Sequence, residues 1–449
     1  MEEPNILFLI IDSFRSDKFF HKEKTSVTPN IDKLIQRGVY FSQTISSASS
    51  SLPAISSLLT GNYPFDSFKQ NEKKSEIVES SMFFLKELKK RNYEMYGFIP
   101  KILTNLSLEK IFGDNLDSYD DNSTLYDGIG DELIAKMKEK KEKSKWFWYI
   151  HLNDIHGPAI FHKDFQHEDF EDVNLGKNQY ERMVSLMDKW LGKIFEEIDF
   201  EKTLVVISAD HGSDVGVFDK EMDRLNLQIR NKKKIPKGKA FDVSHKIISR
   251  SPGFLKPMRK ILSKSYTKRR ENIIENSLEP DLKKLESLQL SPYKKRIMEN
   301  IILGKSQVFD ERFVIPLLFT GYGVNENKII DKQVRSVDIF PTVFSLVGFS
   351  FYEKIHGRTL FPYFNNEDLD ELPAYLQSTE NFSDEKTDTK VIGIRTSDYK
   401  YFRDRDDCMK NVHLYDLHSD PLEEENISEN NKNKVNEMER LLAEISLEN

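Results

Sequence analysis

The run Asn5–Asp12, NILFLIID, decides the fold class, because an unbroken apolar stretch ends there in a carboxylate. Such a run is typical of a strand that is buried on both faces of a largely parallel sheet. Trp146–Leu152 (WFWYIHL) and Leu204–Ser208 (LVVIS) have the same character, and helical patterns separate the three runs. Strands that alternate with helices predict an α/β architecture.

Polar residues follow each of these buried runs. Asp12 ends the first, the segment His151–His156 closes the second, and Asp210 and His211 follow the third. In open α/β sheets, ligands bind at the carboxyl ends of the strands. We therefore expect a functional site where these three strands end.

In the rest of the chain, one long segment interrupts the alternation of strands and helices. From Val217 to about Ile302 the alternation of strands and helices stops, and it resumes at Val314–Thr320 (VIPLLFT). Short extended runs and a charged terminal helix then predict a small antiparallel subdomain. The expected organisation is a main domain over residues 1–365, a basic insertion at about 219–303, and a C-terminal subdomain over 366–449.

Composition excludes several classes of protein. The chain has 449 residues and a net charge of −8, and its one cysteine, Cys408, permits no internal disulfide and no cysteine metal cluster. The start MEEPN lacks the basic residues of a signal peptide, and no apolar window is long enough to span a membrane. These features predict a soluble, cytoplasmic protein.

The insertion carries a strong positive charge. Residues 230–270 hold fifteen Lys or Arg and one acidic residue, so this segment is +14 and the remainder is −22. Within it, Gly253–Tyr266 (GFLKPMRKILSKSY) has apolar residues at helical spacing, which is typical of a basic helix on an anionic membrane or polymer. The alternative is a solvated surface insertion. No nucleic-acid recognition motif accompanies the charge.

Eight segments, taken in chain order, carry the pattern of a known family: Asn5–Asp17, Thr28–Phe41, Ser51–Pro64, Asn153–Pro158, Val205–Gly212, Val334–Gly348, Gly393–Arg403 and Leu414–Ile427. They include NILFLIIDSFRSD, SLPAISSLLTGNYP, NDIHGP and VVISADHG. Together they resemble the sulfatase family of the alkaline phosphatase superfamily. The resemblance implies a three-layer alkaline phosphatase-like sandwich, a mostly parallel central sheet and a small C-terminal antiparallel subdomain.

The strand ends offer ligands for a metal ion. Asp12, Asp210 and His211 supply two carboxylates and one imidazole, which suit one divalent cation that Ser51 and an ester oxygen would complete. Such an ion lowers the pKa of a bound hydroxyl and neutralises charge on an anionic ester. Calcium, magnesium or manganese is expected, and zinc remains an alternative. A structural reading, in which Asp210 caps a turn, stays open.

The segment Ser49–Gly61, SSSLPAISSLLTG, places hydroxyls before a short helix. The resemblance puts the nucleophile at Ser51. Pro53 suits the first turn of a helix, and the free N–H groups and dipole at a helix N-terminus favour an anionic ester. The alternative is that Ser49 to Ser51 only cap the helix.

Two departures from the family pattern bear on the chemistry. Sulfatases oxidise the first residue of a C/S-x-Pro-Ser-Arg motif to formylglycine, but Ala54 and Ile55 replace the serine and arginine here. This makes formylglycine at Ser51 doubtful and favours phosphoester chemistry with an unmodified serine. Ser13 replaces a second aspartate, and the pattern Asp12-x-x-Arg15-x-Asp17 resembles phosphonate and phosphate ester hydrolases.

Four further residues complete the expected site. His156 matches a histidine that donates a proton to the leaving group. Lys305, Lys101 and Arg15 are assigned to substrate binding, because cations neutralise the non-bridging oxygens of the ester. His151 lies inside its strand and is interpreted as structural.

The leading hypothesis is a metal-dependent hydrolase of sulfate esters, or of closely related phosphate esters, with Ser51 or its oxidised form as nucleophile. One alternative is a phosphodiesterase or a transferase that passes a phosphoryl-alcohol group from an unmodified serine to a glycan. Another is a catalytically silent protein that binds an anionic polymer. The expected partner is an anionic sulfate or phosphate ester, with linkage to a glycan as one alternative.

Overall fold

The computed structural model describes residues 3–70, 75–140, 145–156, 170, 172–218, 222, 224–226, 279–303, 308–379 and 389–447. Contacts within the chain divide it into two compact units, Met1–Val217 with Ser306–Asn449, and Phe218–Lys305. Each unit is described by itself. The C-terminal sheet belongs to the first unit, and the domain boundary at residue 365 stays a prediction.

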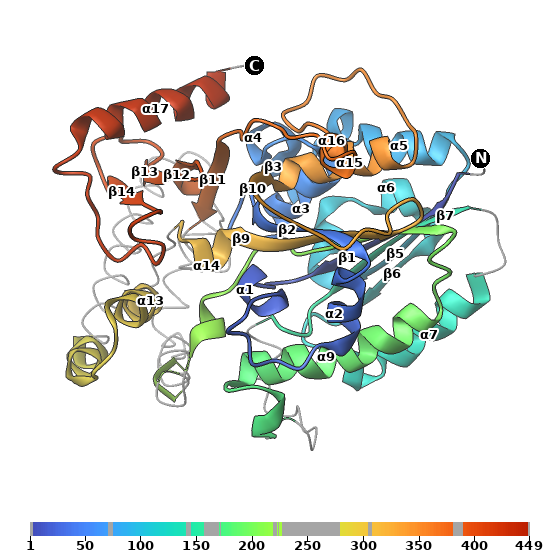
Figure 1. Ribbon diagram of the computed structural model, residues 1–449, viewed down its shortest axis with the longest axis horizontal. Coiled ribbons are helices and arrows are strands. Elements are labelled where there is room, and N and C mark those ends of the chain that lie inside the picture. The colour runs from blue at the N-terminus through green and yellow to red at the C-terminus, as the bar shows by residue number, and fades with distance from the viewer. Residues whose placement is uncertain are drawn as a thin grey trace, which may run out of the picture. The chain divides into compact units, whose positions relative to one another are not determined.

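The first unit is built on an eight-stranded sheet with the strand order β10-β2-β9-β8-β1-β7-β5-β6 (Figure 1). β9 runs antiparallel to β2 and β8, and every other neighbouring pair is parallel. This confirms the mostly parallel sheet that the sequence predicts. The strands are β1 (Asn5–Ile11), β2 (Gly38–Ile45), β5 (Glu94–Pro100), β6 (Leu116–Tyr119), β7 (Trp146–Leu152), β8 (Thr203–Ser208), β9 (Val314–Gly321) and β10 (Lys328–Arg335).

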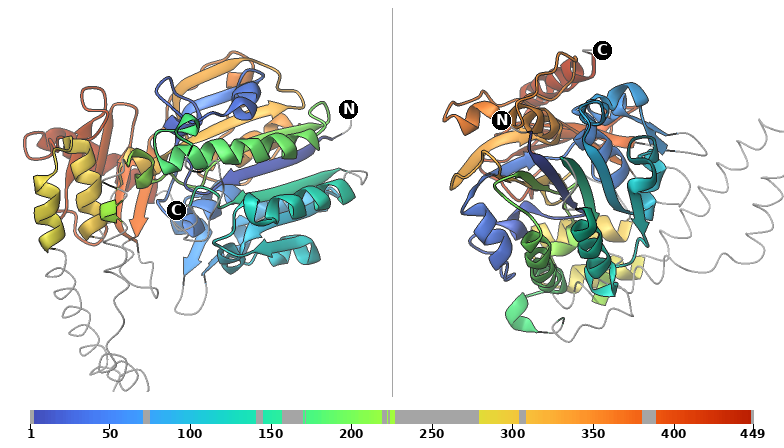
Figure 2. Two further views of the ribbon diagram at one scale, coloured as in Figure 1. Left: turned by 90° about the horizontal axis from the view of Figure 1, so that it is seen from below. Right: turned by 90° about the vertical axis from the view of Figure 1, so that its right-hand side faces the viewer.

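Helices cover both faces of this sheet, as Figures 1 and 2 show. One face carries α3 (Ser51–Thr60), α5 (Phe83–Lys90), α6 (Glu109–Phe112) and α15 (Ile339–Leu346). The other carries α2 (Pro29–Ile35), α7 (Ile129–Lys140) and α9 (Gln179–Glu196). Three layers of this kind confirm the predicted sandwich. Short elements at the connections are α1 (Ser16–Phe19), α4 (Pro64–Ser67), α14 (Asp310–Phe313), α16 (Phe361–Phe364), β3 (Phe68–Gln70) and β4 (Ser75–Ile77).

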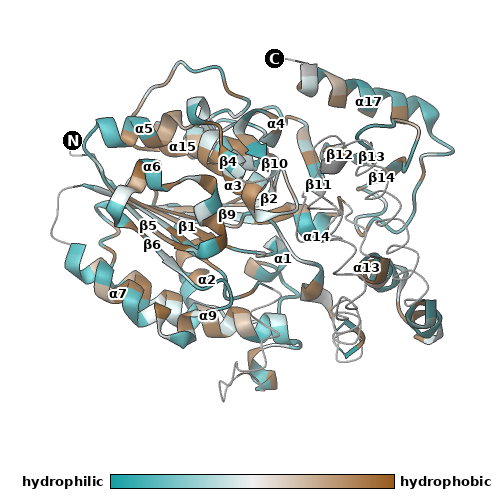
Figure 3. Cartoon of the chain, turned by 180° about the vertical axis from the view of Figure 1, so that it is seen from behind, coloured by the Kyte–Doolittle hydropathy of each residue, from teal (hydrophilic) through white to brown (hydrophobic). Residues whose placement is uncertain are grey.

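One large hydrophobic cluster lies between the sheet and the helices α3, α5, α6 and α15. Phe8 of β1 meets Phe340 of α15 with ring centroids 5.1 Å apart, and Ile55 of α3 belongs to the same fully buried cluster. Figure 3 shows hydrophobic residues along the strands and on the inward sides of these helices. Burial of each large apolar side chain contributes about 1.5–3 kcal/mol, which fixes α3 against the sheet.

A second, four-stranded antiparallel sheet follows, formed by β11 (Ala374–Thr379), β12 (Thr389–Arg395), β13 (Tyr399–Asp404) and β14 (His413–Asp416). Helix α17 (Lys432–Leu447) packs on it through Met438 and Leu442. The predicted antiparallel C-terminal sheet is therefore present. Gln377 of β11 also forms a bridge with Ala48, so this sheet borders the segment that leads into α3.

The second unit contains α13 (Pro292–Leu303) and a helical stretch over residues 279–287. The basic segment 230–270 lies outside the described residues, so its amphipathic helix stays a prediction. In the part of the chain that the structure describes, none of the helices combines the length and the apolar character that a membrane crossing requires.

Candidate active site

Three parallel strands end side by side at one edge of the large sheet. Ile11 of β1 pairs with Leu152 of β7, and Ile10 pairs with Ser208 of β8. The backbone N–H of Asp12 extends this pairing with a 2.8 Å hydrogen bond to the carbonyl oxygen of Leu152. The strand register therefore brings the polar residues that follow each strand to one place.

Ser51, the first residue of α3, joins this edge. Its Oγ donates a hydrogen bond of 3.1 Å to Asp12 Oδ2 and lies 3.3 Å from His211 Nε2. Ser50 is the N-cap residue and makes no side-chain capping bond, while Ser49 Oγ bonds Ser378 Oγ at 2.8 Å. The hydroxyl of Ser51 thus faces the Asp12 carboxylate and the His211 imidazole, and it does not act as a helix cap.

Asp210 presents one oxygen to the site and uses the other to hold the backbone. Its Oδ1 accepts hydrogen bonds from the N–H groups of Ser13, at 3.1 Å, and His211, at 2.7 Å. Its Oδ2 lies 3.5 Å from His211 Nε2 and, among the described residues, has no hydrogen-bond partner. Ser13 reaches Asp210 with a left-handed backbone, at φ 63°.

Asp12 has a similar division of roles. Its Oδ1 accepts a 2.6 Å hydrogen bond from Ser13 Oγ, and its Oδ2 faces Ser51. Burial raises the pKa of Asp12, but the charges of nearby His156, His151 and His211 outweigh it, so the pKa lies well below its usual range. Asp12 is therefore a carboxylate at neutral pH.

The tautomer of His211 follows from its hydrogen bonds. Nδ1 is 2.8 Å from the carbonyl oxygen of Gly212, which only accepts, so the proton of the neutral ring belongs on Nδ1. Nε2 then keeps its lone pair on the side of Ser51 and Asp210. This is the form in which an imidazole binds a metal ion.

His151 joins the same cluster, although the sequence favours a structural role for it. Its ring is fully buried, and Nε2 lies 3.7 Å from Asp12 Oδ2. One ligand atom each from Asp12, His151 and Asp210 lies within 4.8 Å of the others. The sequence feature that indicates a role in the site is the position of His151, one residue before the end of β7. This is the sheet edge at which Asp12 follows β1.

The residues present fit a divalent cation. His151 Nε2 and Asp210 Oδ2 are buried without a hydrogen-bond partner in the described part of the chain. Buried polar atoms normally have partners, and atoms of these two types are common metal ligands. Asp12, Asp210, His211 and Ser51, as predicted, meet at one point.

His156 and Asp154 lie on the turn after β7. The backbone N–H of His156 bonds the carbonyl oxygen of Asn153 at 3.0 Å, and the side chain is half-buried close to Asp12. Asp154 is fully buried; its Oδ1 accepts from the Leu125 N–H at 2.9 Å and its Oδ2 lacks a described partner. Burial raises the pKa of Asp154 to about 7.

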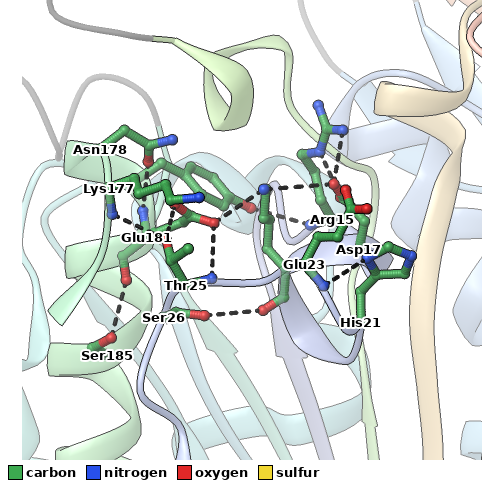
Figure 4. A network of polar contacts seen from close by, with 12 residues as sticks. Arg15, Asp17, His21, Glu23, Thr25, Ser26, Lys177, Asn178, Glu181 and Ser185 are labelled. Atoms are coloured by element: carbon green, nitrogen blue, oxygen red, sulfur yellow. Dashed lines mark hydrogen bonds and ion pairs between the residues drawn. The ribbon is translucent and has the colours of Figure 1, made fainter. Parts of the chain in front are cut away.

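The three predicted substrate-binding cations are placed differently. Arg15 Nε donates to Asp17 Oδ1 at 2.8 Å and Nη1 donates to the Ser213 carbonyl at 3.2 Å, so the guanidinium is held by the chain (Figure 4). Lys101 is exposed at the start of the 3₁₀ turn Lys101–Leu106 that follows β5. Lys305 lies outside the described residues. Their roles stay predictions.

Comparison with known families agrees with this arrangement. The model of the family described as Sulfatase matches residues 4–349, and that described as N-sulphoglucosamine sulphohydrolase, C-terminal, matches residues 299–447. The chain belongs to the sulfatase family. This confirms the resemblance that the eight sequence segments indicate.

Sequence relatives match a part of this chain. Arylsulfatase K of Canis lupus familiaris is 29% identical over 137 residues, which are 29% of this chain and 25% of that protein. Arylsulfatase K of Homo sapiens is 26% identical over 137 residues, with the same two shares. The match thus spans about a quarter of the length of these relatives.

Solved structures match the whole fold. A 2-O GAG sulfatase has a TM-score of 0.63 at 16% identity, covering 99% of this chain and 92% of that one. The phosphonate monoester hydrolase of Agrobacterium radiobacter has a TM-score of 0.60 at 14% identity, covering 99% and 95%. At such identities the likeness establishes the fold alone.

Proposed function

We propose that this sulfatase-family protein is a divalent-metal-dependent hydrolase of sulfate esters or closely related phosphate esters, with Ser51 Oγ as nucleophile. The observation that carries the proposal is the placement of Ser51 Oγ, 3.1 Å from Asp12 Oδ2 and 3.3 Å from His211 Nε2 at the N-terminus of α3. Family membership supports ester hydrolysis as the reaction class.

The residues of the site divide the reaction between them. Ser51 Oγ loses its proton to water and attacks the sulfur or phosphorus atom, and the bond to the ester oxygen breaks as the new bond to Oγ forms. His156 donates a proton to the departing alkoxide. Water then attacks the serine-bound group, which returns the hydroxyl and releases sulfate or phosphate.

Asp12, Asp210, His211 and Ser51 would hold the cation. When bound, the ion lowers the pKa of the serine hydroxyl and offsets negative charge on the ester. The free N–H groups at the start of α3 favour an anion at the same place. The chain's own contribution is to orient Oγ, since Asp12 accepts its hydrogen bond.

The choice between sulfate and phosphate depends on Ser51. Ile55 occupies the position of the arginine that accompanies formylglycine in the family, and it is fully buried in the apolar core. Because residue 55 is an isoleucine, this position supplies no positive charge to stabilise a formylglycine. A serine sulfate also lacks the hemiacetal route by which a formylglycine releases sulfate. This observation favours a second candidate, hydrolysis or transfer of phosphate esters by unmodified serine.

The proposed substrate is a glycan that carries the anionic ester. Solved structures with this fold include a 2-O GAG sulfatase and a Ps i-CgsB complex with a neocarrahexaose, and these titles support a sulfated polysaccharide for the sulfate reaction. Docking through residues 230–270 and a cytoplasmic location stay predictions. The presence of Asp12, Asp210, His211 and His156 near strand ends disfavours a silent binder.

Two measurements on protein from its native host test the proposal. Turnover of an aryl sulfate, an aryl phosphate and an aryl phosphodiester is compared with and without a chelator. The mass of the peptide that contains Ser51 shows whether the serine has lost hydrogen by oxidation. Oxidised Ser51 with sulfate turnover supports the first candidate, and unmodified Ser51 with phosphate or phosphodiester turnover supports the second. Chelator-insensitive turnover, or none, contradicts both.

A further inference from the structure

The imidazole of His151 is buried in a position that ordinary hydrogen bonding does not explain. Nδ1 lies 3.2 Å from Tyr149 Oη, but Nε2 has no hydrogen-bond partner among the described residues. Its nearest charged neighbour is Asp12 Oδ2, at 3.7 Å, which is too long for a hydrogen bond. A buried polar atom without a hydrogen bond is poorly compensated for its lost hydration.

The spacing of the donor atoms suggests another explanation. Two donors that bind one ion at about 2.1 Å and at a tetrahedral angle lie about 3.4 Å apart. The separations here are 3.7 Å between His151 Nε2 and Asp12 Oδ2, and 3.1 Å between Ser51 Oγ and Asp12 Oδ2. His211 Nε2 and Asp210 Oδ2 are 3.5 Å apart. These distances suit donors that share an ion.

The carboxylates also limit which ion fits. Asp210 Oδ1 is occupied by two backbone N–H groups, and Asp12 Oδ1 by the hydroxyl of Ser13. Each carboxylate therefore presents one oxygen to the cluster. Calcium takes six to eight oxygen ligands, whereas imidazole suits zinc, iron and related ions. The described donors are too few in oxygen for calcium and include two ring nitrogens.

We infer that His151 Nε2 is a metal ligand together with Asp12 and Asp210, and that its imidazole favours a first-row transition ion over calcium or magnesium. The inference rests on the proposed metal-dependent function and deepens it. Tyr149 acts as a positioning residue. Its phenolic oxygen accepts a hydrogen bond from the Nδ1–H group of His151, so the lone pair on Nε2 is directed at the cluster.

The first test compares metal binding by the full-length chain and its variants. Metal-free protein is titrated with Mn²⁺, Zn²⁺ and Ca²⁺ separately in a calorimeter. We expect Zn²⁺ to bind more tightly than Mn²⁺, and Mn²⁺ to bind more tightly than Ca²⁺. His151→Leu should weaken Mn²⁺ binding by more than the about 10–100-fold that loss of an outer partner costs, and Tyr149→Phe should fall within that range.

The second test detects the His151 nitrogen directly. Pulsed EPR of the Mn²⁺-loaded wild-type chain should show a coupling from this histidine nitrogen. His151→Leu should lose that coupling, and His413→Leu, on β14 far along the chain, should keep it. Nitrogen couplings that are the same in wild type and His151→Leu, or tighter binding of Ca²⁺ than of Mn²⁺, overturn the inference and leave the serine mechanism standing. Absence of metal binding altogether refutes both.

Discussion

The hydroxyl of Ser51 donates to Asp12 Oδ2 at 3.1 Å across 39 residues of sequence, and this bond joins the start of α3 to the end of β1. It orients Oγ in the cluster that also contains His211. Ser51→Ala removes the nucleophile, so we expect turnover to fall by roughly 10³-fold or more. Steady-state kinetics on the best aryl ester measures this.

Ser50→Ala is the matched control for that variant, because Ser50 precedes α3 and makes no capping bond. Its turnover should stay within about twofold of wild type. Equal activity of Ser51→Ala and wild type would remove Ser51 from the mechanism, whatever metal the protein binds.

Asp210→Asn separates the structural and the ligand roles of that side chain. The amide oxygen can still accept the N–H groups of Ser13 and His211, so the loop should keep its conformation. The amide nitrogen replaces the oxygen that lacks a partner and cannot bind a cation. We expect the fold to persist and metal-dependent stabilisation to disappear.

Thermal unfolding with and without Mn²⁺ measures this difference. Wild-type protein should unfold at a higher temperature when the ion is added, since a ligand that binds the folded state stabilises it. Asp210→Asn should show no shift, and Asp199→Asn, on a surface turn, should respond as wild type does. A full response of Asp210→Asn would exclude Asp210 as a ligand.

Much of this fold can be read from the sequence because its central strands are continuous apolar runs. β1 and β7 begin and end where the patterns of NILFLII and WFWYIHL predict. The sequence left β10 unassigned, because KIIDKQVR belongs to an edge strand that is only partly buried. The reversed direction of β9 carries no signal either, since apolar runs do not encode strand direction.

The sequence predicts those site residues that both follow a buried strand and match a family motif. Asp12, Asp210 and His211 follow buried strands, and the register of a parallel sheet brings such ends together. His151 was interpreted as structural because a single polar residue inside an apolar strand gives no indication of its neighbours. Its contact with Asp12 depends on the register that pairs β7 with β1 and on both side chains lying on the same face of the sheet, which only the assembled sheet determines.

Asp154 gives the protein a dependence of stability on pH. Burial raises the pKa of this carboxyl from 3.8 to about 7, so the folded state holds the proton more tightly than the unfolded state. The contribution of Asp154 to the free energy of unfolding is fully favourable below about pH 4 and is lost as the pH rises through 7. The free energy of unfolding changes by about 4 kcal/mol over this range. Asp154→Asn should abolish this loss.

Urea unfolding at pH 5 and pH 8, with a chelator present to exclude metal binding, tests the prediction. Relative to wild type, Asp154→Asn should gain stability at pH 8 compared with pH 5. Asp114→Asn changes an exposed residue and should follow the wild-type curve at both values. Parallel curves for Asp154→Asn and wild type would show that Asp154 is ionised without penalty.

Lys400 of β13 holds an ion network that joins the C-terminal sheet to the start of α14. Its fully buried ammonium contacts Asp310 and lies 2.7 Å from Glu423 Oε1. Lys400→Met leaves both carboxylates with less compensation, so we expect a loss of about 3–5 kcal/mol in the free energy of unfolding. Lys410→Met breaks an exposed pair with Asp404 and should cost no more than about 1 kcal/mol. Chemical denaturation compares the two, and equal costs would refute the role of the network.

Ile55 shows how far this chain has departed from the formylglycine motif. Its side chain is fully buried in the cluster beneath α3, where an arginine would place an unpaired charge among apolar groups. Ile55→Arg should therefore destabilise the protein by at least about 4 kcal/mol, whereas Ile55→Leu should cost less than about 1.5 kcal/mol. Denaturation curves and the mass of the Ser51 peptide are measured on both variants. A stable Ile55→Arg protein with oxidised Ser51 would mean that the core accommodates the motif arginine, and the argument for an unmodified serine would fail.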